Sequence, residues 1–303
     1  MNRRNKVGAG FHAHPPKNNL NGRAMRAPTI FRICLIYTIL ILFAVVALFP
    51  VVFIATNSFM SESEIMQSYD ESTKIDFHII PREFSLQGYI GVFLLTPSYL
   101  MKFWSSMFIS FAIMAGQVII SCLGGYGFAK FRFPLKNVIF YFMIILMMMP
   151  LQVTLVPNYI VLDKIGLTGS YASLILPGVF STFGVFLLTQ IFSSVPDNLI
   201  EAAKIDGANH MQILFRVMIP YARSGVASLV ILNFIDTWNM VEQPLVFLKD
   251  STKYPLSIFL ANINQADLDI SFVCGILAII PVFLLFLHFK DSLISGIENT
   301  NLK

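Results

Sequence analysis

Residues 103–128 read FWSSMFISFAIMAGQVIISCLGGYGF, a continuous run without one charged side chain. A helix that crosses the hydrocarbon core of a bilayer needs about 20 predominantly apolar residues. No water is available there, so the backbone must satisfy its own hydrogen bonds and the run is expected to be helical. Five further predominantly apolar runs occur, at Ile30–Ala55, Val138–Tyr159, Tyr171–Ile191, Gly225–Phe247 and Phe272–Lys290. The sequence therefore predicts an all-α, polytopic membrane protein with six transmembrane helices.

The composition agrees with this class. The 303 residues are 56% hydrophobic and 13% charged, with a mean hydropathy of +0.70. Soluble domains carry about 25% charged residues, so a soluble globular protein is excluded. The first apolar run is longer than the apolar region of a secretory signal, about 7–15 residues, and no small-residue cleavage site follows it. It is predicted to be an uncleaved helix.

Proline interrupts several of the predicted helices. Pro150 and Pro157 lie in the third run, Pro177 in the fourth, Pro244 in the fifth and Pro281 in the sixth. Proline removes a backbone hydrogen bond and kinks a helix. Membrane helices tolerate this where neighbouring helices or a watery cavity satisfy the freed carbonyls. The pattern favours a packed bundle with a pathway over a simple anchor.

The charges between the runs predict the orientation, because basic segments stay on the cytoplasmic side. Residues 1–29 contain basic residues and no acidic one, and the link after the second run carries Lys130, Arg132 and Lys136 without an acid. In the segment between the first two runs, acidic residues outnumber basic ones. Both termini and the second and fourth loops are therefore expected in the cytoplasm.

This orientation divides the chain into three parts: a basic cytoplasmic tail at 1–29, a six-helix domain at 30–290 with a cytoplasmic loop at 192–223, and a cytoplasmic tail at 291–303. The basic tail suits either an arm that binds nucleic acid or anionic lipid, or a tail that only fixes the topology. Membrane insertion already requires the second role. We expect membrane lipid as a partner and no nucleic acid.

Motifs for chemistry are missing from the sequence. It contains no phosphate-binding G-x-x-x-x-G-K-[ST] loop, H-E-x-x-H, G-x-S-x-G or paired C-x-x-C. Cys34, Cys122 and Cys274 fit neither a metal site nor a disulfide framework. We expect no catalytic residue, no metal site and no cofactor.

The loop at 192–223 has the pattern of two short helices. Asp197 favours the start of the first helix, and Gly207 suits the left-handed residue that ends it. Asn209 and Gln212 have the spacing of a capping box for the second helix, and Pro220 marks the return to the membrane. Small alanines on an exposed face would let another protein approach closely. A solvated helical hairpin that only connects two spans is the other interpretation.

The same loop resembles the cytoplasmic "EAA" loop of ABC importer permeases, in which Glu-Ala-Ala precedes a glycine and, further on, a proline. The residues that match are Glu201, Ala202, Ala203, Asp206, Gly207 and Pro220. Pro150–Pro157 and Thr237-Trp-Asn followed by Pro244-Leu are similar to the maltose-type carbohydrate permeases of this family. The resemblance covers roughly residues 30–296.

The resemblance implies a multi-pass permease subunit in the inner membrane of a prokaryote. It implies a second permease subunit, two cytoplasmic ATPase subunits that hydrolyse ATP, and an extracytoplasmic solute-binding protein. The matching loop residues would couple the permease to the ATPase. Two departures stand out: the family's Gly-rich tail is replaced by Gly296–Lys303, and Glu242-Gln243 occupy positions that are commonly apolar or aromatic.

Polar residues in the fifth run are candidates for the solute path: Asn233, Asp236, Trp238, Asn239 and Gln243. On one helix, the four residues other than Trp238 would lie broadly along one side. They could line a path for a hydroxylated solute, or form a polar seam that joins helices. Trp238 could stack on a sugar ring or serve in packing.

Amides both donate and accept hydrogen bonds, which suits the hydroxyl groups of a neutral sugar or oligosaccharide. An anionic solute would favour Arg or Lys in the path. The alternatives are another small polar solute, including a cationic one, or a secondary transporter that uses Asp236 and Glu242 as proton sites. No internal repeat supports the secondary transporter. An intramembrane enzyme is disfavoured by the missing motifs.

Overall fold

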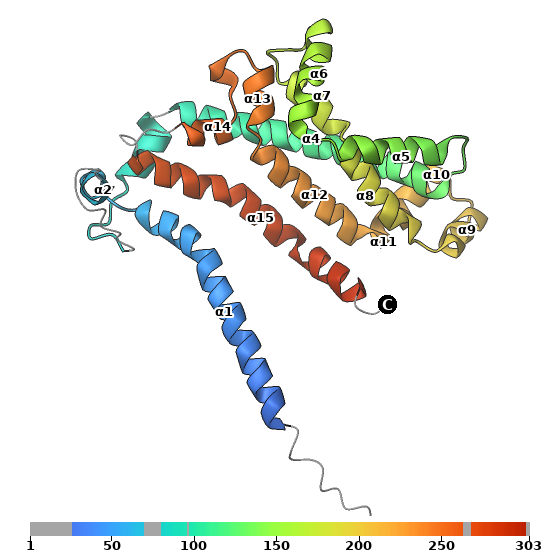
Figure 1. The fold of residues 1–303 in the computed structure, drawn as a ribbon, viewed down its shortest axis with the longest axis horizontal. Helices are drawn as coiled ribbons and strands as arrows, with labels where there is room; N and C mark the ends of the chain where they lie inside the picture. The colour runs from blue at the N-terminus through green and yellow to red at the C-terminus, as the bar shows by residue number, and fades with distance from the viewer. Residues whose placement is uncertain (1–25, 70–79, 96, 263–267, 301–303) are drawn as a thin grey trace, which may run out of the picture. The chain divides into compact units, whose positions relative to one another are not determined.

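The computed structural model describes residues 26–69, 80–95, 97–262 and 268–300, and the regular structure within these ranges is helical throughout (Figure 1). The elements are α1 (Arg26–Asn57), α2 (Glu62–Tyr69), α3 (Gln87–Ile90), η1 (Gly91–Leu95), α4 (Pro97–Lys130), α5 (Lys136–Met147), α6 (Leu151–Lys164), α7 (Ala172–Val179), α8 (Thr182–Ser193), α9 (Asp197–Ile205), α10 (His210–Ile213), η2 (Leu214–Met218), α11 (Ile219–Tyr221), α12 (Arg223–Trp238), α13 (Glu242–Phe247), η3 (Ser251–Lys253), α14 (Leu256–Ala261) and α15 (Leu268–Thr300).

The chain divides into two compact units, residues 1–52 and 53–303. The described part of the first unit is the beginning of α1, whose side chains from residue 31 to residue 52 are exposed and almost all apolar. A helix that is apolar on all sides is typical of a membrane span. The predicted basic tail at 1–29 lies almost entirely outside the described residues.

In the second unit, α4 is the central helix. It packs against α7, α8, α12 and α14, and α12 packs in turn against α15 (Figure 1). The approach of α4 to α8 is close because Gly125 has no side chain: an added Cβ would lie 2.9 Å from Leu188 Cβ and 3.1 Å from the Thr189 backbone nitrogen. Small residues permit such close contacts between membrane helices.

The prediction of a polytopic helical membrane protein is confirmed. Within the described residues, four helical segments are long and apolar enough to span a bilayer: Phe31–Asn57, Ser98–Lys130, Ala172–Ser193 and Ile270–Ser292. Two bent pairs, α5 with α6 (107°) and α10–α11 with α12 (82°), bring the number of candidate spans to six if each pair counts as one.

The structure shows where the third and fifth runs depart from one straight helix. The third run is interrupted between Met147 and Leu151, where Pro150 precedes α6 with φ −57° and ψ 141°. The fifth run ends at Trp238, and α13 starts only at Glu242. At Pro150 the extended backbone stops the helical hydrogen-bond ladder, whereas the break after Trp238 lies at residues 239–241, before Pro244.

Smaller differences concern the other runs. The fourth run contains a break between α7 and α8, at Phe180 and Ser181. The sixth helix is longer than expected, because α15 continues through the predicted tail at 291–303 as far as Thr300.

Candidate coupling loop and solute path

The first helix of the loop, α9, is amphipathic. Pro196 precedes it in extended conformation, and Asp197 in its first turn is the acidic residue that the helix dipole favours there. Ile200 is buried and Ala203 is half-buried against the core, whereas Glu201 and Ala202 are exposed. The expectation that both alanines lie on the exposed face is therefore wrong for Ala203, because positions 200 and 203 form the inward stripe of the helix.

The turn at Gly207 is the one that the sequence predicts. Gly207 has φ +80°, its amide donates to the Lys204 carbonyl at 3.0 Å, and the Ala208 amide donates to the Ala203 carbonyl at 2.9 Å. These two hydrogen bonds define a Schellman motif. Asp206 is exposed and is the last residue before this turn.

The predicted capping box is confirmed. The backbone N–H of Gln212 donates to Asn209 Oδ1 at 2.9 Å, and the backbone N–H of Asn209 donates to Gln212 Oε1 at 2.8 Å. The helical path then runs through α10, η2 and α11, which contains the exposed Pro220. The bend into α12 follows at Ala222.

Two attachments join this loop to the end of α4. Lys130 Nζ, at the last residue of α4, donates to the Val195 carbonyl at 2.6 Å and to Asp197 Oδ1 at 2.7 Å. The hydrogen bond from Lys130 holds the pKa of the Asp197 carboxyl below its usual range, so this group is ionised at neutral pH. Tyr126 Oη lies 3.2 Å from Nδ1 of His210, the first residue of α10.

The path candidates do not form one stripe, because the helix break separates them. Asn233 is buried and Asp236 is exposed on α12, Asn239 follows the end of α12, and Gln243 is half-buried on α13. The side-chain Nδ2 of Asn239 donates to the backbone carbonyl of Ile235 at 2.8 Å, in the last turn of α12.

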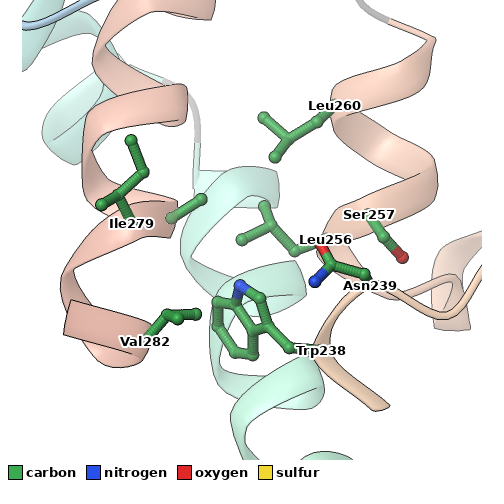
Figure 2. Close-up of a pocket in the computed structure, with 8 residues that line it drawn as sticks. Trp238, Asn239, Leu256, Ser257, Leu260, Ile279 and Val282 are labelled. Carbon is green, nitrogen blue, oxygen red and sulfur yellow. The ribbon is translucent and has the colours of Figure 1, made fainter. Parts of the chain in front are cut away.

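Trp238 is a packing residue of the core. It is 5% exposed, its ring stacks on Phe234 with centroids 5.5 Å apart, and it meets Phe103 edge-on at 5.7 Å. One edge of the ring also faces a cavity of about 230 Å³ between α12, α14 and α15 (Figure 2). The cavity lining is largely aliphatic, with Asn239 and Ser257 as its polar members.

The structure adds two polar features that the sequence reasoning missed. Gln152 Nε2 on α6 donates to both carboxylate oxygens of Glu242, at 3.0 and 3.2 Å. Four buried side-chain oxygens have no hydrogen-bond partner within the described part of the chain: Ser110 Oγ, Gln117 Oε1, Ser121 Oγ and Asn233 Oδ1. The first three lie on α4 at spacings of seven and four residues, which place them on one face; this spacing was readable from the sequence.

Comparisons with known proteins identify the family. Residues 117–298 match the family described as "Binding-protein-dependent transport system inner membrane component". The arabinooligosaccharides transport system permease protein of Bacillus subtilis is 30% identical over 228 residues, which cover 74% of this chain and 80% of the relative. The sn-glycerol-3-phosphate transport system permease protein of Brucella abortus is 31% identical over 202 residues, covering 65% of this chain and 72% of the relative.

A solved structure shares the fold. A chain of a bacterial ABC transporter involved in the import of the acidic polysaccharide alginate superposes with a TM-score of 0.73 at 22% identity, covering 88% of this chain and 97% of that chain. The family match implies ATPase and binding-protein partners and places the chain in the bacterial inner membrane. The chain belongs to the inner membrane components of binding-protein-dependent ABC importers, as a multi-pass permease subunit that is not itself catalytic.

Proposed function

We propose that this permease forms one half of the translocation path for a neutral sugar or oligosaccharide, and that the segment Glu201–Gly207 couples it to a separate ATPase. A second permease subunit supplies the other half of the path, two ATPase subunits bind on the cytoplasmic side, and a solute-binding protein delivers the solute from outside.

One observation carries the proposed path: an exposed polar patch surrounds the break at the end of α12. Asp236, Asn239, Glu242 and Gln152 are exposed, and the last two are hydrogen-bonded to each other. Exposed polar side chains are costly next to lipid tails, and a carboxylate most of all. The patch therefore fits a surface that a second subunit completes around a watery path.

The composition of the patch supports a neutral solute. Its members are two amides and two carboxylates, with no basic group to pair with a phosphate or carboxylate of the solute. The relatives bear names for both kinds of solute, since one transports arabinooligosaccharides and the other sn-glycerol-3-phosphate. The side chains at the break favour the first kind.

The loop geometry supports coupling. Both of its turns are closed by its own hydrogen bonds, and Glu201 and Ala202 face outward from a helix whose inner face is fixed by Ile200. A rigid element with a small outward side chain can seat against another protein. A ligand shifts a conformational equilibrium only through contacts that differ between the states, and this loop would provide them for the ATPase.

The solute assignment can be tested in the reconstituted complex with the double variant Asn239→Leu, Gln152→Leu, which removes both amides of the patch. We expect uptake of a neutral oligosaccharide to fall about tenfold or more, as for the loss of one or two hydrogen bonds to the solute. Co-purification with the ATPase should be unchanged. Asn262→Leu is the matched control, because Asn262 also donates to a carbonyl four residues earlier, that of Ile258 at 2.9 Å. Import of a phosphorylated or carboxylated solute with no uptake of neutral sugars would refute the assignment.

A further inference from the structure

The coupling loop is attached to a single spanning helix at both of its short helices. Lys130 contacts the start of α9, since its two acceptors are the Val195 carbonyl and the Asp197 carboxylate. His210, at the start of α10, lies against Tyr126 and Phe131, with ring centroids 6.3 and 4.8 Å apart. All three contacting residues lie within or directly after the last turns of α4.

The Lys130 contact is more than a surface ion pair. The Lys130 side chain is 11% exposed, and Val195 is 2% exposed, so the hydrogen bond to the Val195 carbonyl is shielded from water. The Asp197 side chain is 78% exposed, and an exposed ion pair of this kind contributes little by itself. Lys130 matters for a different reason. Its ammonium group has three donors, so it holds the backbone at Val195, where the chain enters the loop, and Asp197, in the first turn of α9, at the end of α4.

The other end of α4 is attached in the same way. Lys102 Nζ donates to the carbonyls of Ser251 and Thr252, each at 2.6 Å, in the link between α13 and α14. Tyr99 Oη donates to the carbonyl of Cys274 at 3.3 Å. One helix of 34 residues thus connects the coupling loop with the segments at the opposite end of the permease.

We infer that Lys130 is a positioning residue that fastens the coupling loop to α4, so that loop and helix move together when the ATPase changes state. This inference rests on the proposed coupling function of the loop. Of the two attachments, it assigns most of the transmission to Lys130: without Lys130, the loop would still meet the ATPase, but its displacement would no longer be passed to α4 in full.

The test compares Lys130→Met with Lys136→Met in the reconstituted complex. Methionine keeps much of the apolar stem of Lys130 and removes its donors. Lys136 is the matched control, because it carries the same charge near the same corner but, within the described residues, its ammonium group donates only to the carbonyl of Phe131, at 3.1 Å. The measurement is the number of ATP molecules hydrolysed per solute imported. For Lys130→Met this number should rise about tenfold, as for the loss of a charge-assisted hydrogen bond, and for Lys136→Met it should stay at the wild-type value.

Lys130→Arg, which can still donate to both acceptors, should restore most of the coupling. A merely structural role would lower the thermal stability or the amount of complex without changing the ratio of ATP to solute. If Lys130→Met does not assemble, Lys130→Gln decides, because glutamine keeps a polar side chain but lacks the ammonium group and is one atom too short to hold both acceptors. A wild-type ratio in whichever of the two variants assembles would overturn the inference.

A photocrosslinking residue at Ala202, which is exposed on α9, separates this inference from the proposed function beneath it. Capture of the ATPase subunit from Ala202, together with a wild-type ratio in Lys130→Met, would refute only the role of Lys130. No capture from Ala202 in an assembled, active complex would refute the loop as the ATPase contact and the inference with it.

Discussion

Ser106 and Ser110 lie one turn apart on the same buried face of α4, yet their hydroxyl groups differ in one respect. Ser106 Oγ accepts a hydrogen bond from the Leu256 amide at 2.7 Å, whereas Ser110 Oγ has no partner within the described residues. Removing one partner of a buried hydrogen bond leaves the other unsatisfied, while removing an unpaired hydroxyl removes a desolvation penalty.

Alanine substitutions at these two serines should therefore have different effects on stability. Ser106→Ala should cost about 1–3 kcal/mol, because it strands the Leu256 amide. Ser110→Ala should be neutral or stabilising. Thermal unfolding of the purified complex in one detergent measures both. An equal loss of stability in the two variants would show that Ser110 has a partner of its own.

At the scale of elements, the coupling loop depends on the left-handed turn at Gly207. An added Cβ would meet nothing within 4 Å there, so the constraint comes from φ +80° and not from space. A left-handed conformation costs about 1–2 kcal/mol for an ordinary residue, and more for a β-branched one. Gly207→Val should therefore displace α10 relative to α9 and abolish uptake while the protein still inserts and accumulates.

The control for this variant is Gly127→Ala on α4, where an added Cβ also meets nothing within 4 Å and alanine favours the helix. Its uptake should equal that of the wild type. Normal uptake by Gly207→Val at a normal protein level would mean that the loop is only a connector.

The success of sequence reasoning differed between these elements for a physical reason. The caps and turn of the loop are local: Asn209, Gln212 and Gly207 act on backbone groups within a few residues, so their spacing was sufficient. The ends of the spans could not be predicted as well. Apolar composition predicts that a segment lies in the membrane, but it does not predict at which residue the helical hydrogen bonds end. The break after Trp238 therefore separated Asn239 and Gln243 from the stripe on which they were expected.

Contacts between distant segments were beyond prediction. The attachment of Lys130 to Val195 and Asp197, and of Gln152 to Glu242, joins residues 65 to 90 positions apart. In the sequence, the charge of Lys130 predicts the side of the membrane on which it lies, but not its partners. A single sequence carries no signal that pairs it with the loop.

At the scale of the whole molecule, the charges of the links predict the orientation in the membrane, and labelling can test it. In a background with Cys34 replaced by alanine, Lys249→Cys should react with an impermeant thiol reagent added outside intact cells. Met211→Cys, next to the capping box on α10, should react only after permeabilisation. Both positions are exposed, with 62% of the Lys249 side chain and 54% of Met211 accessible, and Cys122 and Cys274 are buried. The reverse labelling pattern would show the opposite orientation, with the coupling loop on the outer side of the membrane, away from a cytoplasmic ATPase.

The break between α5 and α6 also has a consequence for biogenesis. α5 has 12 residues and α6 has 14, so at 1.5 Å per residue they extend about 18 and 21 Å, and neither reaches across a hydrocarbon core of about 30 Å. Neither helix is therefore a full span by itself. α5 packs against α8, which leaves the ribosome later. Until Thr182–Ser193 has been synthesised, α5 lacks this partner, so α5 reaches its final packing only after α8 has been made.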